Sequence, residues 1–281
     1  MEQIQSLLGK YMEQSSDPLS PEEWEKFRVD GFNESEGNLH EEDGHQCKIC
    51  RNKGLIMRAV QQDNGIWSSV SRECKCMSVR RTISRMKRSG LKNIIKDYTF
   101  DKFEAVDDWQ KTIKDAAVSY SQKPDGWFFI GGQSGAGKTH ICTAICREFL
   151  LNSRAVKYML WRDDVVKLKN AVTEHEEYSR LMEQYKKIDV LYIDDLFKTG
   201  KAPDGHKQMP TPADVNAAFE ILNYRYNDPA LLTIISSECT INDILDIDEA
   251  VGGRIFERAK HNFSINSDKK KNYRLRGAVE L

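Results

Sequence analysis

The pattern of apolar and polar residues divides the chain into a helical N-terminal part and a C-terminal part in which strands and helices alternate. Near the start, apolar residues recur at the spacing of an amphipathic helix. These residues are Ile4, Leu7, Leu8, Tyr11 and Met12. A second short helix is predicted to begin with the N-cap Ser20 and Pro21, and it would carry Trp24 and Phe27 on one face. Residues 30–45 are rich in Gly, Asn and Glu and are predicted to form a loop, whereas residues 78–96 have a helical pattern.

From residue 127 onwards the pattern becomes that of an α/β protein. Short apolar runs predict strands at residues 127–131, 156–161, 190–193, 231–236 and 263–265. Capping residues and polar periodic stretches predict helices at residues 138–151, 163–187 with a break near Thr173, 211–227, from 240, and 248–260. Because alternating strands and helices are typical of parallel sheets, we expect a parallel sheet with helices on both faces.

Composition narrows the class of protein. The chain has 281 residues, of which 40% are hydrophobic and 30% charged, which is enough for one large and one small domain and excludes a fibrous or wholly disordered protein. No apolar run reaches the roughly 18–20 residues of a membrane helix. The N-terminus has neither the basic nor the apolar region of a secretory signal. We therefore expect a cytoplasmic protein without a membrane partner.

The net charge of −1 conceals a strong asymmetry along the chain. Residues 1–45 hold 12 acidic and 3 basic residues, whereas residues 46–96 hold 2 acidic and 13 basic residues. This contrast indicates different partners for the two segments, and nucleic acid is a candidate partner for the basic one. The alternative is that both charged runs are solvated surface.

The spacing of four of the seven cysteines indicates a metal site rather than disulfides, since no secretory signal is present. A CxxC pair and a CxC pair contain these residues, which are Cys47, Cys50, Cys74 and Cys76. Two such pairs can supply four thiolates to one tetrahedral Zn²⁺ in a closed, structural site. His40 and His45 are alternative ligands for the metal. The alternative to a metal site is that the four cysteines are unrelated free thiols.

Residues 132–139 match the phosphate-binding motif GxxxxGK[ST] in full, between a predicted strand and a predicted helix. The predicted nucleotide-binding residues are Gly132, Gln133, Ser134, Gly135, Ala136, Gly137, Lys138 and Thr139. The glycines let the backbone wrap the phosphates, and the helix N-terminus adds a partial positive charge. We expect Lys138 to reach the β- and γ-phosphates of ATP and the Thr139 hydroxyl to bind Mg²⁺.

Two carboxylates, Asp194 and Asp195, follow the predicted strand at residues 190–193. They lie at its C-terminal end, which is the edge of an α/β sheet where ligands bind. We expect Asp194 to hold Mg²⁺ through water and Asp195 to polarise the attacking water, so that Asp195 and Lys138 are catalytic. A pair of aspartates that only caps the strand is the alternative.

The predicted strand at residues 156–161 lies between these two motifs along the chain. That arrangement is typical of ATP-driven AAA+ and RecA-like machines, in which an extra strand separates the two motif strands. Together with the four-cysteine module, the motifs resemble those of the DnaC and DnaI type of helicase loader, in particular the phage-encoded members. The resemblance extends from about residue 40 to the C-terminus. The segments that carry it are residues 47–50, 74–76, 89–91, 98–103, 132–139, 193–196, 235–238 and 249–258.

The resemblance implies an AAA+ P-loop ATPase with a five-stranded parallel sheet, a truncated lid and a small N-terminal zinc-binding module. It places the sensor residue at Ser237 or Glu238, in Ser236-Ser237-Glu238. It places an arginine finger at Arg254, which would reach the ATP of a neighbouring copy. Arg274 is a candidate for the sensor-2 arginine.

The resemblance also implies the function and the partners. It implies an ATP-dependent protein that binds the hexameric replicative DNA helicase through its N-terminal part and delivers it onto single-stranded DNA. Lys167 and Lys169, in the polar stretch between the second and third core strands, are the candidate DNA contacts, and a solvated helix is the alternative. The implied organisation is an acidic helical arm (1–45), a zinc-binding module with a basic linker helix (46–96) and an ATPase domain (97–281) that self-associates.

Two other functions remain open from the sequence. One is an IstB-like helper ATPase of transposition, which shares the AAA+ core. The other is a zinc-containing helicase adaptor that uses ATP as a conformational ligand with little turnover, since Asp195 is shorter than the Glu that many AAA+ proteins carry at this position.

Overall fold

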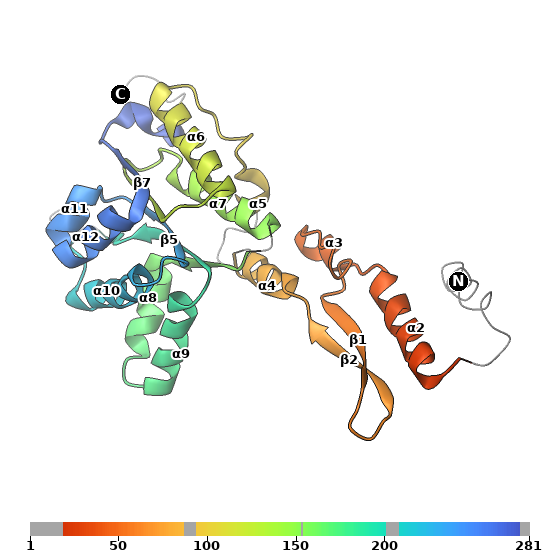
Figure 1. Cartoon of the computed structure of the whole chain (residues 1–281). Coiled ribbons are helices and arrows are strands. Elements are labelled where there is room, and N and C mark those ends of the chain that lie inside the picture. Colours follow the sequence, from red (N-terminus) through yellow and green to blue (C-terminus); the bar gives the residue numbers. More distant parts are fainter. Residues whose placement is uncertain (1–18, 87–93, 153, 201–207, 276–281) are drawn as a thin grey trace. The chain divides into compact units, whose positions relative to one another are not determined.

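The computed structural model describes residues 19–86, 94–152, 154–200 and 208–275 (Figure 1). The chain divides into two compact units between residues 81 and 82, and each unit is described by itself. The amphipathic helix predicted around Leu7 lies outside the described residues. None of the helices in the described ranges is long and apolar enough to cross a membrane.

The first unit combines helices with a two-stranded antiparallel hairpin. Its elements are α2 (Pro21–Glu34), α3 (Leu39–Asp43), β1 (Leu55–Gln61), β2 (Trp67–Glu73) and the first part of α4 (Cys76–Met86). α2 begins where predicted, because Ser20 and Glu23 form a reciprocal capping box. Near its other end, the Asn33 side chain donates to the Met57 carbonyl (3.0 Å) and accepts from the Met57 N–H (3.1 Å). These two bonds attach α2 to β1.

Two features of this unit differ from the sequence prediction. The predicted loop over residues 30–45 is wrong, since α2 continues to Glu34 and α3 occupies Leu39–Asp43. Gly31 lowers helix propensity, but burial of Val29 and the bonds of Asn33 to the hairpin compensate for it. The hairpin itself was not predicted, although the Asn64-Gly65 pair at its turn is a strong local signal.

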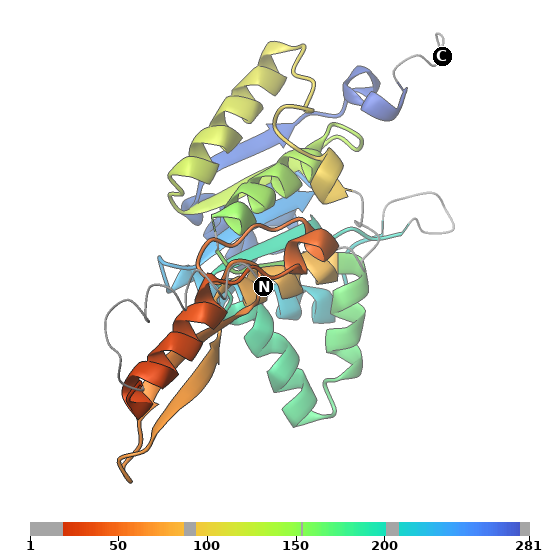
Figure 2. The same ribbon diagram turned by 90° about the vertical axis from the view of Figure 1, so that its right-hand side faces the viewer.

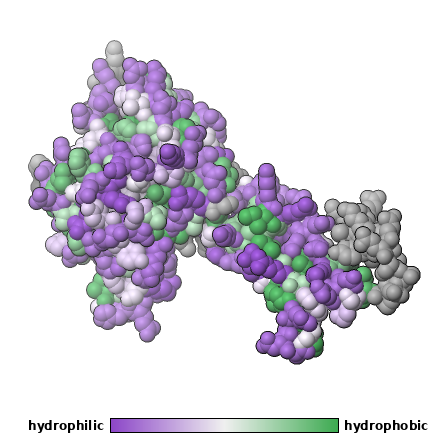
Figure 3. Space-filling view, viewed as in Figure 1, coloured by the Kyte–Doolittle hydropathy of each residue, from purple (hydrophilic) through white to green (hydrophobic). Residues whose placement is uncertain are grey.

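Several apolar side chains remain exposed on the first unit, where Figure 3 shows green patches. Trp24 and Phe27 share one face of α2 as predicted, with their rings stacked at a centroid distance of 5.9 Å. Trp24 is 51% exposed. The other large apolar residues exposed on this unit are Ile49, Leu55, Ile66 and Val70. Large contiguous apolar patches mark protein-interaction sites, and these residues are the candidates for such a patch on this unit.

The second unit is an α/β domain built on a five-stranded sheet. Its strands are β3 (Trp127–Gly132), β4 (Val156–Leu160), β5 (Val190–Leu196), β6 (Leu232–Ser237) and β7 (Ala259–Ile265). Its helices are α5 (Ile94–Asp97), α6 (Asp108–Gln122), α7 (Lys138–Leu151), α8 (Trp161–Asn170), α9 (His175–Lys186), α10 (Pro212–Tyr226), α11 (Ile241–Ile247), α12 (Glu249–Arg258) and the short 3₁₀ turns η2 (Lys269–Lys271) and η3 (Tyr273–Leu275). Most predicted elements are confirmed within one to four residues, and α8 and α9 are separated close to Thr173 as expected. α6 was not predicted.

All strand pairs in this sheet are parallel, in the order β4-β5-β6-β3-β7. The predicted parallel α/β fold is therefore confirmed. Along the chain β4 lies between the motif strands β3 and β5 as expected, whereas in the sheet β6 separates them and β4 lies at the edge.

Helices cover both faces of the sheet (Figures 1 and 2). Alternate strand residues such as Phe129 and Ile193 pack in one core with side chains of α8, α10 and α12. The intervening residue Phe128 contacts Tyr120 of α6, which in turn contacts Phe149 of α7. This alternation is what a sheet buried on both faces requires.

A fully buried arginine, Arg225 of α10, joins the N-terminal ends of β5 and β6. Its guanidinium donates to five backbone carbonyls and one hydroxyl, which belong to Tyr185, Lys186, Ile188, Asp189, Leu232 and Thr233. Burial lowers the pKa of Arg225, but six acceptors require the protonated form. The residue therefore supplies donors to backbone carbonyls at the ends of α9, β5 and β6.

We expect Arg225→Met to lower the free energy of unfolding by about 3 kcal/mol or more, because several buried carbonyls would lose their donor at once. Urea denaturation followed by circular dichroism measures the change. Arg180→Met is the matched control, since Arg180 pairs with Glu177 on the exposed side of α9. Equal stability of the two variants would contradict this role for Arg225.

Candidate functional site

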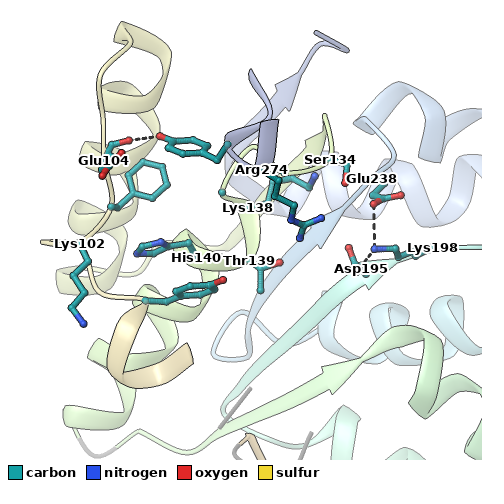
Figure 4. Close-up of a pocket in the computed structure, with 15 residues that line it drawn as sticks. Lys102, Glu104, Ser134, Lys138, Thr139, His140, Asp195, Lys198, Glu238 and Arg274 are labelled. Carbon is teal, nitrogen blue, oxygen red and sulfur yellow. Dashed lines mark hydrogen bonds and ion pairs between the residues drawn. The ribbon is translucent and has the colours of Figure 1, made fainter. Parts of the chain in front are cut away.

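A cavity of about 340 Å³ lies at the carboxyl ends of the strands in the second unit (Figure 4). One end is charged and is formed by residues that follow β3, β5 and β6. The other end is aromatic and is formed by Tyr98, Phe103, His140 and Tyr273. A charged end beside an aromatic end suits a ligand that has both phosphates and a base.

The loop at residues 132–139 borders this cavity and has the backbone conformation that its glycines permit. Gly132, Gly135 and Gly137 have φ angles of 102°, 73° and 85°. A Cβ atom at Gly137 would lie 2.8 Å from Phe103 Cε2, and one at Gly135 would overlap the Asn272 side chain. The loop therefore needs glycine both for its conformation and for close packing.

Lys138 is buried at the start of α7, and its ammonium donates to the carbonyls of Gly132 (2.8 Å) and Gln133 (2.7 Å). Burial lowers the pKa of Lys138, an effect that the carboxylates of Glu238 and Asp195 oppose. The loop thus holds a positive charge against its own backbone, at a position from which it can reach bound phosphates.

Asp194 is the buried carboxylate of the site. It accepts hydrogen bonds from Thr139 Oγ1 (3.2 Å), from the Tyr158 hydroxyl (2.9 Å) and from Ser236 Oγ. Burial raises the pKa of Asp194, and the bond from Ser236 opposes this shift. The structure brings Thr139 and Asp194 together, and their hydroxyl and carboxylate oxygens are the ligand types that Mg²⁺ prefers.

Asp195 and Glu238 lie at the charged end of the cavity with a lysine between them. The Lys198 ammonium is 2.8 Å from Asp195 Oδ2 and 3.2 Å from Glu238 Oε1 (Figure 4). Burial opposes the charge on Lys198, yet Asp195 and then Glu238 keep its pKa above the ordinary value. Burial also disfavours the Glu238 carboxylate, but Lys198 and then Ser134 hold its pKa below the ordinary value. Lys198 and Glu238 are therefore both charged at neutral pH.

The aromatic end is assembled around His140 of α7. The rings of Tyr98 and His140 stack at a centroid distance of 4.4 Å, and Phe103 meets His140 edge-on at 5.2 Å. His140 Nε2 donates to the Thr99 carbonyl (2.8 Å), and burial lowers the pKa of His140. The ring is therefore neutral at pH 7 and suited to stacking.

The structure brings only some of the sequence-predicted residues to this cavity. Of the two sensor candidates, Glu238 lines it, whereas Ser237 is buried and bonds to the Leu196 carbonyl and the Cys239 N–H. Ser237 therefore lies outside the cavity lining, and the sensor role of either residue stays a prediction. Arg274, the sensor-2 candidate, lines the cavity.

The other predicted residues lie elsewhere in the second unit. Arg254 is on α12, where its guanidinium stacks on Phe219 (4.7 Å) and donates to Asn223 Oδ1 (3.0 Å). Lys167 pairs with Asp164, and Lys169 pairs with Asp214. The finger role of Arg254 and the DNA contacts of Lys167 and Lys169 stay predictions.

Lys198, Ser236 and Tyr158 also belong to this site and were not predicted from the sequence. Lys198 follows Asp195 by three residues, and Ser236 directly precedes the sensor candidates. Their positions next to these motifs could have indicated that both residues belong to the site. Tyr158 had no such signal, since its contact with Asp194 depends on the pairing of β4 with β5.

The first unit contains the four-cysteine cluster. The Sγ atoms of Cys47, Cys50, Cys74 and Cys76 all lie within 4.8 Å of one another, and all four residues are buried. The Cys47–Cys74 and Cys50–Cys76 sulfur distances are 3.8 and 3.5 Å. Four thiolates at Zn–S distances of about 2.3 Å in a tetrahedron are separated by about 3.8 Å, so the cluster fits zinc.

The backbone turns tightly directly after the CxxC pair of the cluster. Arg51 and Asn52, after the CxxC pair, have φ angles of 46° and 65°, which turn the chain tightly. Burial opposes ionisation of Cys50, but the Gly54 N–H and the neighbouring thiols lower its pKa to about 7, whereas burial raises the pKa of Cys74 and Cys76. In the part of the chain that the structure describes, no histidine joins the cluster, which leaves the cysteines as its ligands.

The Asn52 side chain links the cluster to α4. Its carbonyl oxygen accepts from the Cys47 N–H (2.8 Å) and from Arg80 Nη2 (3.2 Å). Arg80 is itself buried and forms an ion pair with Asp43 at 2.7 Å. Part of the basic character of this segment therefore stabilises the unit.

The fold and the cavity define the chain as a P-loop NTPase of the AAA+ type. The family model for IstB-like ATP binding proteins matches residues 66–280, and the chain belongs to this family. The phage-like element PBSX protein XkdC of Bacillus subtilis (strain 168) is 31% identical over 227 residues, which cover 76% of this chain and 79% of XkdC. The resemblance deduced from the motifs is thereby confirmed.

The replicative helicase loader DnaC of Escherichia coli (strain K12) is 28% identical over 152 residues. This alignment covers 51% of the chain and 60% of DnaC, so it spans less than two thirds of that relative. A crystal structure of the DnaC helicase loader has a TM-score of 0.49 and 16% identity, over 62% of this chain and 98% of the other.

We expect one zinc per chain, held by the four cysteines. Cys47→Ser or Cys74→Ser should release the metal and unfold the first unit, because metal binding supplies much of the folding free energy of such small units. Metal analysis of protein purified without chelators measures the ratio. Cys239→Ser, outside the cluster, should keep the zinc, and wild-type protein without zinc would refute the assignment.

We expect Lys138→Ala to abolish measurable ATP affinity and to leave the fold intact, because it removes the ammonium that the loop holds beside the cavity. Titration with a fluorescent ATP analogue measures the affinity. Lys187→Ala, at an exposed position on the C-terminal side of α9, should bind like the wild type. Unchanged binding by Lys138→Ala would place the nucleotide elsewhere.

Proposed function

We propose that this protein is an ATP-dependent loader that binds the replicative DNA helicase and delivers it onto single-stranded DNA. The observation that carries the proposal is the cavity lined by the P-loop and Asp195, with Asp194 bonded to Thr139 of that loop, in a chain that is similar to a replicative helicase loader. ATP hydrolysis at this cavity would supply the directionality of loading.

The cavity suggests how ATP binds. The phosphates would lie at the charged end, along the loop N–H groups and Lys138, and the base would lie at the aromatic end beside His140. Thr139 and Asp194 would hold Mg²⁺, which supplies charge neutralisation for the transferred phosphoryl group. Asp195 would accept the proton of the attacking water.

The first unit is proposed to bind the helicase. It carries the exposed apolar residues Trp24, Ile49 and Ile66, and the arm at residues 1–45 is strongly acidic. Phosphate repels such an arm, whereas a basic protein surface attracts it and would speed the encounter. Zinc would hold the fold of this unit without taking part in chemistry.

Single-stranded DNA is proposed to contact the second unit through Lys167 and Lys169 of α8. Lys167 is the more exposed of the two, with 65% of its side chain accessible against 33% for Lys169. Self-association is proposed to bring Arg254 to the nucleotide of a neighbouring copy. The division into residues 1–45, 46–96 and 97–281 remains part of this proposal.

A helicase adaptor with little ATP turnover is the second candidate. One observation favours it: Asp195, the proposed proton acceptor, is engaged in an ion pair with Lys198 at 2.8 Å. An IstB-like helper of transposition is the third candidate, because the matching family model is that of IstB-like ATP binding proteins. The three differ in the protein that they capture and in ATP turnover.

The full-length protein, immobilised and incubated with purified replicative helicase, should retain the helicase. Retention should not require ATP, because the proposed helicase-binding residues Trp24, Ile49 and Ile66 lie on the unit that lacks the P-loop. Lys138→Ala should therefore capture helicase as the wild type does but fail to transfer it to single-stranded DNA. A pair of substitutions, Trp24→Ser and Ile49→Ser, should reduce capture about tenfold, the expected effect of removing two apolar anchors.

Failure of the wild-type protein to retain the helicase would refute the loader proposal, and a low ATPase rate with intact capture would favour the adaptor.

A further inference from the structure

The turn after β5 has an unusual backbone. Asp195 and Phe197 both have a φ angle of 58°, in the left-handed region that bulky residues seldom occupy. The register between β5 and β6 shifts between Ile193 and Leu196, where this turn begins. Such conformations persist only where the surroundings impose them, and they cluster at functional sites.

Burial of Phe197 holds this turn in place. Its ring is fully buried and meets Trp161 of α8 edge-on at a centroid distance of 5.6 Å. The Lys198 N–H then bonds to the Asp195 carbonyl (2.9 Å), which closes the turn. The consequence is that the Lys198 side chain returns to the cavity instead of extending from the end of the strand (Figure 4).

Lys198 faces two carboxylates there. Its ammonium lies between Asp195 (2.8 Å) and Glu238 (3.2 Å), and Glu238 also interacts with Ser134 of the P-loop. Without a cation at this point, two carboxylates would border the part of the cavity next to the P-loop and repel a terminal phosphate. Lys138, the other lysine of the charged end, bonds to the loop carbonyls and does not pair with either carboxylate at ion-pair distance.

We propose that Lys198 binds the terminal phosphate of ATP and thereby lets the cavity distinguish ATP from ADP. This inference rests on the proposed function, in that it takes the cavity to be the ATP site. The ammonium is already desolvated in part and held in place, so it exchanges a carboxylate for a phosphate oxygen at little entropic cost.

The same exchange connects nucleotide binding to catalysis. Without ATP, the Lys198 ammonium donates a hydrogen bond to one carboxylate oxygen of Asp195. When Lys198 turns to the terminal phosphate, Asp195 is released to accept a proton from water. The water oxygen then bonds to the γ-phosphorus, the bond to the β-γ bridging oxygen breaks with its electron pair leaving on ADP, and the proton goes to Asp195.

Binding of a non-hydrolysable ATP analogue (AMPPNP) and of ADP, each with Mg²⁺, to the full-length protein tests the inference. Lys198→Gln should weaken AMPPNP binding by roughly 10- to 100-fold, the range expected for one charge-assisted bond, and should change ADP binding less than about twofold. Lys198→Arg should keep most of the preference for AMPPNP. Lys187→Gln is the matched control, since Lys187 pairs with Glu183 on α9, away from the cavity.

The outcomes are distinguishable. Unchanged AMPPNP affinity in Lys198→Gln, or equal losses for AMPPNP and ADP, would overturn the role of Lys198 while leaving the ATP site in place. Wild-type protein that binds neither nucleotide would overturn the proposed function and this inference together. ADP binding by Lys198→Gln also reports that its cavity is folded.

Discussion

The buried carboxylate of Asp194 is the interaction on which the geometry of the nucleotide site depends. It accepts hydrogen bonds from Thr139 of α7, Tyr158 of β4 and Ser236 of β6, so one side chain of β5 joins both neighbouring strands to the P-loop helix. Burial raises its pKa, and a nearby cation would favour its charged form. The position of the phosphate-binding loop is therefore fixed by Asp194, and the negative charge of this carboxylate is most stable when a cation is bound beside it.

The opposite ends of the same strands are fixed by a different kind of interaction. At their N-terminal ends, β5 and β6 are joined by Arg225, a cation surrounded by neutral carbonyls. At their C-terminal ends they are joined by Asp194, an anion surrounded by hydroxyls. Buried ions with several hydrogen bonds specify geometry more than they add stability. These two neighbouring strands are thus held in register at both ends, and the strained turn after β5 lies between their C-terminal ends and the cavity.

The parts of the structure that the sequence predicted are those whose signals are local. The glycines, Lys138 and the apolar strand before them lie within a dozen residues, and the bounds of α7 were predicted without error. The two cysteine pairs were predicted in the same way. The hairpin of the first unit had a local turn signal at Gly65 that was not used, and the loop assigned to residues 30–45 was wrong because contacts with the hairpin, not propensity, extend α2. The aromatic end of the cavity could not be predicted, since it joins Tyr98 to Tyr273 across most of the second unit.

The segment that follows β7 has a consequence for how the P-loop is held. The Tyr273 N–H bonds to the Gly135 carbonyl (2.9 Å), the Asp268 N–H bonds to the Gln133 side chain (2.8 Å), and the Tyr273 hydroxyl meets Gln110 of α6 (2.5 Å). The loop is thus clamped from outside by a segment that belongs to no strand of the sheet. Lys269, Lys270 and Lys271 stand within this segment, so trypsin has its preferred cleavage sites there. Proteolysis would therefore detach the clamp while sparing the sheet, and the rate of cleavage reports how firmly the loop and its clamp hold each other.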